Sequence, residues 1–222
     1  RQLEVCGQSL WLDYLKRSLI GKGELRTLIE WDGLKGVTSN PSIFEKAIGE
    51  IDEYADALKR FQAEADHGIS AIYEHLAIAD IRDAADVLRP VYDGTRGGDG
   101  YVSLECSPYL ANDTEATVVE ALRLWAAVDR PPNLMVKVPA TPAGIPAIRQ
   151  LIGRGLNINI TLLFAVSVYE QVVEAYISGL EDFARTGGDI SRIGSVASIF
   201  VSRIDVAVDK WLDQLGDKQM AG

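Results

Sequence analysis

The residue best suited to covalent chemistry is a lysine inside a short apolar run, Lys137 in residues 134–138. Side chains alternate between the two faces of a strand, so Leu134, Val136 and Val138 share one face and Lys137 projects from the other. A lysine buried in this way is desolvated, which disfavours the ammonium and makes the neutral amine available as a nucleophile. A lysine that reaches solvent from a strand end would have no such role. On this segment alone, both interpretations stay open.

Polar and apolar residues alternate without interruption over residues 156–162, where Asn157, Asn159 and Thr161 share one face. The same alternation predicts inner faces that carry Trp11 with Asp13, Thr38 with Asn40, Ser103 with Glu105, and Val196 with Ser198 and Phe200. A buried polar group without a partner costs about 1–3 kcal/mol. These side chains therefore need one another, water or a ligand, and we expect them at the carboxyl ends of the strands, where barrel enzymes place their chemistry.

A single arginine, Arg203, follows the last of these strands. Its guanidinium is a fixed cation that suits bidentate phosphate binding. An isolated arginine is more often an ordinary surface residue, so the strand before it is what makes the position informative.

Six strands have to position these residues, and a stretch with helical periodicity follows each of them. The expected strands are residues 9–15, 34–39, 101–106, 133–138, 156–162 and 193–200, and the expected helices are residues 23–30, 41–65, 70–88, 113–127, 143–152, 167–186 and 205–215. This alternation is typical of βα units and predicts an α/β fold, a TIM-type barrel that holds about six of the usual eight units. We expect residues 1–222 to form one domain, truncated at its C-terminus relative to a complete barrel.

Composition limits the partners. The chain holds 22 Lys and Arg against 32 Asp and Glu, a net charge of −10, which argues against a nucleic-acid partner because basic side chains neutralise phosphates there. Charged or turn-forming residues interrupt every apolar stretch before the roughly 18 residues that a membrane span needs, so we expect no membrane partner. The two cysteines, Cys6 and Cys106, lack the spacing of a zinc site or a disulfide framework. We expect no metal and a cytoplasmic location.

Six segments taken in order carry a family pattern: residues 11–13, 36–44, 102–105, 136–140, 157–164 and 198–203. Each lies at an expected strand end, and together they extend over nearly the whole chain. The pattern resembles that of the transaldolase family. The resemblance implies an α/β barrel that moves a dihydroxyacetone unit from a ketose phosphate, such as sedoheptulose 7-phosphate or fructose 6-phosphate, to an aldose phosphate, with no cofactor.

The resemblance also implies roles for the residues at the matching positions. Lys137 would form the Schiff base with the ketose carbonyl, and Asp13 would be the acid/base that takes the hydroxyl proton when the carbon–carbon bond breaks. Glu105 and Thr161 would hold a water that shuttles protons during imine formation and hydrolysis. The substrate would be bound by Asn40, Asn159 and Ser198 through its hydroxyls and by Arg203 through its terminal phosphate, with Phe200 beside them on the inner face.

Two other functions stay open at this point. The same lysine could support an aldolase that releases free dihydroxyacetone, if a proton rather than an acceptor sugar traps the enamine. The chain could also be an inactive barrel fragment with a structural role. The resemblance further allows a fused glucose-6-phosphate isomerase domain, and a homo-oligomer is a further possibility.

Overall fold

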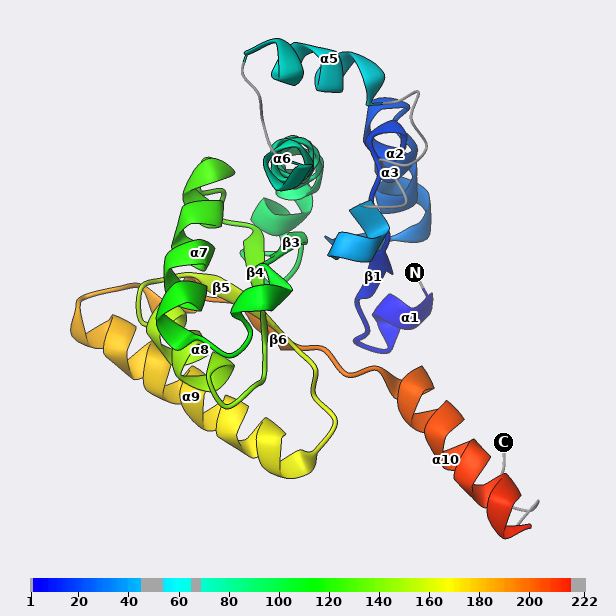
Figure 1. Ribbon diagram of the computed structural model, residues 1–222, viewed down its shortest axis with the longest axis vertical. Helices are drawn as coiled ribbons and strands as arrows, with labels where there is room; N and C mark the ends of the chain where they lie inside the picture. The colour runs from blue at the N-terminus through cyan, green and yellow to red at the C-terminus, as the bar shows by residue number, and fades with distance from the viewer. Residues whose placement is uncertain (1, 45–53, 65–68, 217–222) are drawn as a thin grey trace.

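The computed structural model describes residues 2–44, 54–64 and 69–216 of the chain (Figure 1). Its centre is a parallel sheet of six strands in chain order: β1 (Leu10–Asp13), β2 (Leu34–Thr38), β3 (Tyr101–Glu105), β4 (Leu134–Pro139), β5 (Asn157–Thr161) and β6 (Ser195–Ala197). Each overlaps one expected strand, so the predicted set is confirmed. The last strand is shorter than expected, because the chain leaves the sheet after Ala197.

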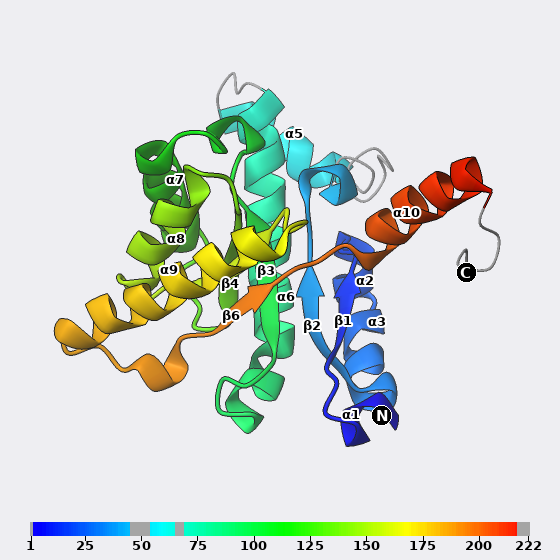
Figure 2. The same ribbon diagram turned by 90° about the horizontal axis from the view of Figure 1, so that it is seen from below.

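The sheet curls into a half-barrel with helices on its outer side (Figures 1 and 2). Its register pairs Asp13 with Thr38, Thr38 with Ser103, and Glu105 with Lys137. The first and last strands, β1 and β6, are the edges of the sheet. The fold is a partial TIM-type α/β barrel, as the sequence predicted.

Helices connect the strands. They are α1 (Gln2–Val5), α2 (Arg17–Gly21), α3 (Glu24–Thr27), α5 (Ala55–Glu64), α6 (Ile69–Gly94), α7 (Thr114–Ala127), α8 (Gly144–Ile152), α9 (Val166–Arg185) and α10 (Val201–Leu215), with short turns η1 (Leu28–Asp32), η3 (Pro108–Leu110) and η4 (Ile190–Arg192). The expected helix 23–30 is split between α3 and the wider turn η1. Of the expected helix 41–65, residues 41–44 and α5 are helical, and residues 45–53 and 65 lie outside the described ranges.

Two further helix boundaries differ from the expected ones by more than one residue. Helix α6 continues past residue 88 through Pro90 to Gly94, because proline removes one hydrogen-bond donor without ending a helix that tertiary packing supports. Helix α10 begins at Val201 rather than at residue 205. The β-branched Val201 favours a strand by composition, and it is helical here because the strand has already ended.

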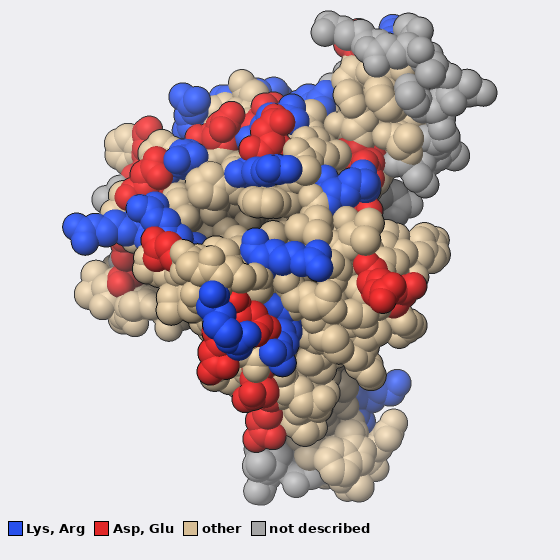
Figure 3. All heavy atoms as spheres, turned by 90° about the vertical axis from the view of Figure 1, so that its left-hand side faces the viewer, with Lys and Arg blue, Asp and Glu red and all other residues tan. Residues whose placement is uncertain are grey.

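The apolar core lies between the sheet and its outer helices. Outward side chains such as Val37, Val102, Val136 and Ile158 are at most 1% exposed, as the alternation of strand residues requires. The outer faces of the helices carry acidic and basic residues side by side (Figure 3). Among them, Arg123 of α7 bonds to Glu74 of α6 at 2.6 Å. No helix in the described part of the chain is long and apolar enough to cross a membrane.

An ion pair between the half-buried Arg17 and the buried Asp80 holds the segment that follows β1. Arg17 Nε donates to Asp80 Oδ1 at 2.7 Å, and the Tyr54 hydroxyl donates to Asp80 Oδ2 at 2.6 Å. Burial raises the pKa of the Asp80 carboxyl, and the contacts with Tyr54 and Arg17 oppose that rise. These contacts hold the start of α2 against α6, so the loop between Asp13 and α2 has a fixed end.

Aromatic side chains fill the inner side of the half-barrel at the amino ends of the strands. The Trp11 and Tyr101 rings are 6.3 Å apart, and Trp11 Nε1 donates to Asp99 Oδ1 at 2.9 Å. Gly36 lies beside Trp11 in the sheet, and a Cβ there would come within 2.5 Å of the indole ring. The missing side chain of Gly36 is therefore what lets the indole lie against β2.

We expect Gly36→Ala to lower the free energy of unfolding by about 1–3 kcal/mol, since overpacking a filled interior forces ring or backbone shifts. Urea unfolding followed by circular dichroism measures this. Gly21→Ala is the matched control, because a Cβ there meets nothing within 4 Å and alanine favours a helix over glycine. Equal midpoints for the two variants would contradict the packing argument.

The final helix, α10, extends away from the rest of the molecule (Figures 1 and 2). Its apolar side chains Val201, Val206, Trp211 and Leu215 are 60–69% exposed. The chain beyond β6, which includes Phe200 and Arg203, is thus held by fewer contacts than the elements before it.

Candidate active site

Lys137 lies on the inner face of β4, with only 6% of the residue exposed. Its Nζ donates to the backbone oxygen of Ser39 at 3.0 Å and lies 3.7 Å from Glu105 Oε2. The side chain therefore leans across β3 to the end of β2. This burial is what the inward placement predicted, and it excludes the alternative of a lysine that reaches solvent from a strand end.

Glu105 ends β3 beside Lys137 in register. Burial raises the pKa of its carboxyl, the neighbouring Lys137 lowers it, and the negative charge of Asp13 raises it further. The net direction is upward. A carboxylate with a raised pKa takes up a proton more readily, so Glu105 is suited to accept one from the lysine nitrogen.

Asp13 stands at the carboxyl end of β1 and is exposed. Its negative charge raises the pKa of Glu105, so the two carboxylates lie at the same end of the half-barrel. Thr161 ends β5, pairs with Pro139 of β4 and is 6% exposed. The predicted group of Lys137, Asp13, Glu105 and Thr161 thus lies at the carboxyl ends of four strands.

The residue after Thr161 has an unusual backbone. Leu162 has φ of 61°, in the left-handed region. A bulky residue there costs on the order of 1–3 kcal/mol, and such strain clusters at functional sites. The chain accepts this cost directly after β5, at the residue that follows Thr161.

Polar side chains on the inner faces of β3 and β5, and Ser198 just after β6, form a connected chain. The Ser198 hydroxyl donates to Asn159 Oδ1 at 2.7 Å, and Asn159 Nδ2 donates to the Ser103 hydroxyl at 3.0 Å. The Ser39 hydroxyl donates to the Ser103 backbone oxygen at 2.8 Å. The sequence predicted that the inward polar groups would meet, and Ser198, Asn159 and Ser103 do. Ser39, which the alternation did not place on the inner face, joins them through the Ser103 backbone.

Two residues of β2 and its loop complete the inner surface. Asn40 Oδ1 accepts from the backbone N–H of Ile43 at 3.0 Å, so the predicted sugar ligand also caps the helical turn at residues 41–44. This contact uses the carbonyl oxygen and leaves the amide group able to donate. Thr38 Oγ1 is buried without a hydrogen-bond partner among the described residues. Thr38 lies between Asp13 and Ser103, its neighbours in register, so its hydroxyl can form a hydrogen bond with a ligand there.

Phe200 and Arg203 lie together at the start of α10. The guanidinium of Arg203 is 4.2 Å from the centroid of the Phe200 ring. Phe200 is half-buried and Arg203 is exposed. Ser198, two residues before Phe200, bonds to Asn159 of the strand-end cluster. The contact that the structure shows for Arg203 is with the Phe200 ring.

Three residues near the lysine have no role in the sequence prediction: Ser39, Ser103 and Tyr73. Burial and the charge of Glu105 raise the pKa of Tyr73 to about 12, so this tyrosine of α6 is close to the site. The alternation placed Ser103 on the inner face, and this placement was the only feature of the sequence that pointed to it. Ser39 bonds to the lysine through its backbone, and the type of a residue carries no signal for such a contact.

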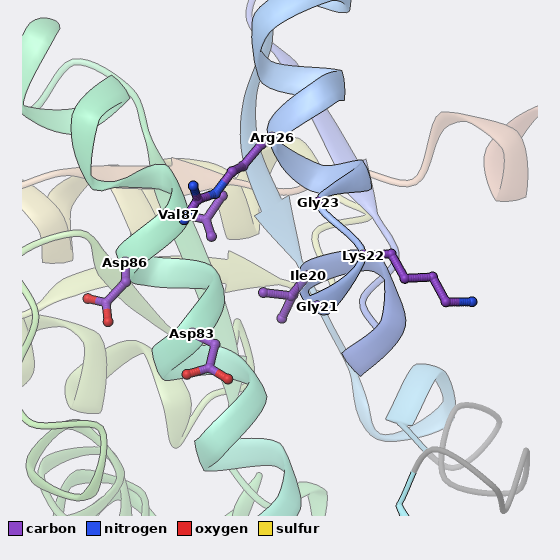
Figure 4. Close-up of a pocket in the computed structure, with 8 residues that line it drawn as sticks. All are labelled: Ile20, Gly21, Lys22, Gly23, Arg26, Asp83, Asp86 and Val87. Carbon is purple, nitrogen blue, oxygen red and sulfur yellow. The ribbon is translucent and has the colours of Figure 1, made fainter.

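A groove of about 480 Å³ lies elsewhere, between the α2–α3 corner and α6 (Figure 4). Asp83 and Asp86 project from α6 on one side, Arg26 reaches toward Val87, and Lys22 points away. It is on the outer, helical side of the sheet. The titratable cluster at the strand ends, not this groove, is the candidate active site.

The arrangement can support covalent chemistry on a carbonyl compound. A buried lysine supplies a nitrogen nucleophile, and two carboxylates of different burial can move protons. In the described ranges, no three His, Cys, Asp or Glu side chains gather as metal ligands would.

The fold and site define a partial TIM-type barrel with a buried lysine facing carboxylates. The chain belongs to the transaldolase/fructose-6-phosphate aldolase family, whose sequence model matches residues 10–221. It is 50% identical over 213 residues to a transaldolase of Thiobacillus denitrificans, a match that covers 96% of the chain and 59% of the relative. It is 48% identical over 213 residues to a transaldolase of Trichodesmium erythraeum, with 96% and 56% covered. The resemblance in the sequence is confirmed, and the chain spans less than three fifths of the length of these relatives.

Proposed function

We propose that the chain carries the catalytic lysine of a transaldolase, which moves a dihydroxyacetone unit from a ketose phosphate to an aldose phosphate through a Schiff base on Lys137. The observation that carries the proposal is Lys137 itself, buried on an inner face and 3.7 Å from Glu105. Membership of the family and the relatives named transaldolase support the same reaction. Sedoheptulose 7-phosphate and fructose 6-phosphate are the proposed donors.

In the first half-reaction, the neutral amine of Lys137 attacks the ketose C2, and the carbonyl π electrons move to oxygen. Glu105 would accept one proton from the lysine nitrogen and pass it to the C2 oxygen, which gives a neutral carbinolamine. A second proton, taken up from solvent, would let that oxygen leave as water while the nitrogen lone pair forms the C=N bond. Thr161, beside Lys137 at the end of β5, would hold the water that relays these protons. The result is an iminium, which is an electron sink next to C3.

Bond cleavage follows from that sink. Asp13 takes the proton of the C4 hydroxyl, the C3–C4 bond breaks, and its electron pair flows into the iminium to give an enamine. The aldose phosphate product leaves. An acceptor aldose phosphate then receives the enamine carbon at its aldehyde, and Asp13 returns its proton to the new hydroxyl.

The remaining residues would bind the sugar. Asn40, Asn159 and Ser198 offer hydrogen bonds at the strand ends, and Arg203 would hold the terminal phosphate. The stacking of Arg203 on Phe200 supports this, because an aromatic ring can fix the plane of a guanidinium.

The second candidate is cleavage that releases free dihydroxyacetone. It stays open because the family to which the chain belongs includes fructose-6-phosphate aldolase as well as transaldolase. The two reactions share every step up to the enamine and differ in whether an aldehyde or a proton traps it. Turnover of fructose 6-phosphate that needs an added aldose phosphate identifies transfer, and turnover without one identifies cleavage.

The test of the imine is reduction with borohydride in the presence of fructose 6-phosphate, followed by peptide mass mapping. We expect the mass of the reduced ketose adduct on the peptide that contains Lys137. An adduct on another lysine would contradict the role of Lys137, and the absence of any adduct would leave the half-barrel with a structural role.

The binding partners of the protein and its location in the cell are also proposals. We expect phosphorylated sugars as partners rather than nucleic acid or membranes, in the cytoplasm, as the acidic composition and the metabolic family suggest. A homo-oligomer or a fused isomerase domain stays a prediction, which sedimentation and the mass of the native polypeptide can check.

A further inference from the structure

We infer that Ser39 is a positioning residue for Lys137: its backbone oxygen orients the lysine nitrogen, and its hydroxyl locks that oxygen in place by bonding to β3. The inference rests on the proposed function of Lys137 and names a support that neither the sequence pattern nor the family match assigns. Lys137 Nζ donates to Ser39 O at 3.0 Å, and Ser39 is fully buried.

The Ser39 carbonyl is held from both sides. On one side, the Ser39 hydroxyl donates to the backbone oxygen of Ser103 at 2.8 Å. On the other, the backbone and side-chain oxygens of Asn40 accept from Ile43 N–H at 3.1 and 3.0 Å, which closes the helical turn after the strand. The peptide between these anchors has little freedom to rotate, so its oxygen is a fixed acceptor.

The lysine nitrogen needs such an acceptor because its carboxylate neighbour does not fix its direction. Glu105 is 3.7 Å away, beyond hydrogen-bond length, and an ion pair at that distance attracts without orienting. The bond to Ser39 O is directional. When the Ser39 oxygen accepts one N–H of the neutral amine, the attacking lone pair has a defined direction toward the strand ends. The same oxygen can later accept the N–H of the iminium.

Ser103 joins this support to the proposed sugar site. Its backbone oxygen accepts from Ser39, and its hydroxyl accepts from Asn159 Nδ2 at 3.0 Å. One serine of β3 therefore links Ser39, the residue after β2, to the Asn159–Ser198 pair. The strands β2, β3 and β5, with Ser198 after β6, hold the reacting nitrogen and the sugar ligands in one frame.

The experiment measures the rate of imine formation in Ser39→Ala by rapid quenching into borohydride with fructose 6-phosphate. We expect that rate to fall about 10- to 100-fold, the scale of loss when a reacting group is misplaced by about 1 Å, with little change in the ketose concentration for half-saturation. Ser39→Thr keeps the hydroxyl and is expected to recover most of the rate. Thermal melting of each variant shows that it is folded.

Ser195→Ala is the matched control. The Ser195 hydroxyl also donates to a strand oxygen, that of Ile158 at 3.0 Å, so both variants lose the same kind of bond, and only Ser39 touches the lysine. We expect Ser195→Ala to trap the imine at the parent rate. Equal rates for Ser39→Ala and the parent, or equal slowing in both variants, would overturn the inference.

A crystal structure of Ser39→Ala separates this inference from the proposed function. We expect Lys137 Nζ to move out of hydrogen-bond distance of the residue 39 oxygen. If the bond persists unchanged, the inference is wrong whether or not Lys137 forms an imine. If the parent protein forms no imine while the bond is lost in the variant, the proposed function fails and the positioning role of Ser39 stands.

Discussion

Lys137→Met is expected to lower turnover at least about a thousandfold, the scale of loss when a covalent catalyst is removed. Methionine lacks only the terminal atom of the lysine side chain and keeps an unbranched apolar stem, so the inner face stays nearly filled. The substitution removes the nitrogen that bonds to Ser39 O and pairs with Glu105. Steady-state turnover of fructose 6-phosphate with an added aldose phosphate measures the effect, and borohydride should trap no adduct.

The fold should survive this change because Glu105 can adjust. Lys137 lowers the pKa of the Glu105 carboxyl, so loss of the lysine raises that pKa further and the buried carboxyl takes up a proton instead of standing as an unpaired charge. Lys35→Met is the matched control, since Lys35 lies on β2 and pairs with Glu4 at 2.8 Å away from the inner face. Residual turnover above about one thousandth of the parent value in Lys137→Met would sink the assignment.

The inner face of the half-barrel was predictable because strand alternation is a local rule. Lys137, Asn159 and Glu105 could be placed on one face from the sequence alone, since side chains of period two share a face once the strand is recognised. The parallel register then brings the strand ends together. The position of each residue along its strand therefore fixed its place in the site.

Contacts made by the backbone could not be predicted in this way. The oxygen that Lys137 uses belongs to Ser39, and every residue has such an oxygen, so no residue type marks it. The left-handed turn at Leu162 also escaped the sequence, because leucine is not a residue that favours positive φ. Both features depend on how the strands curl relative to one another.

The end of β6 and the start of α10 differ from the predicted residues, 200 and 205, because they too depend on contacts between elements. Phe200 and Val201 look like strand residues by composition, yet β6 ends at Ala197. An edge strand has a partner on one side only, so fewer contacts extend its pairing to the residues that propensity favours. Strand propensity reflects packing against a paired neighbour, so it could not predict where that pairing ends, and the predicted boundary was wrong.

Asp13→Ala is expected to form the Schiff base and then stop. In the proposed mechanism, imine formation uses Lys137 and Glu105, whereas cleavage needs a base for the C4 hydroxyl. Borohydride should therefore trap more ketose adduct while turnover falls by about 100-fold or more, within the range attributed to a lost general base. Removal of the Asp13 charge also lowers the pKa of Glu105, because that charge raises it. The pH dependence of imine formation that Glu105 governs should therefore move to lower pH.

A role for Asp13 in capping or packing alone predicts a different pattern, which Asp113→Ala defines. Asp113 accepts from Ala116 N–H at 2.9 Å as the cap of α7, so its loss should cost about 1 kcal/mol of stability and leave both trapping and turnover unchanged. If Asp13→Ala behaves like Asp113→Ala, with normal cleavage of fructose 6-phosphate, then Asp13 is structural. Glu105, the other carboxylate within reach of Lys137, would then have to serve as the base for cleavage as well as for imine formation.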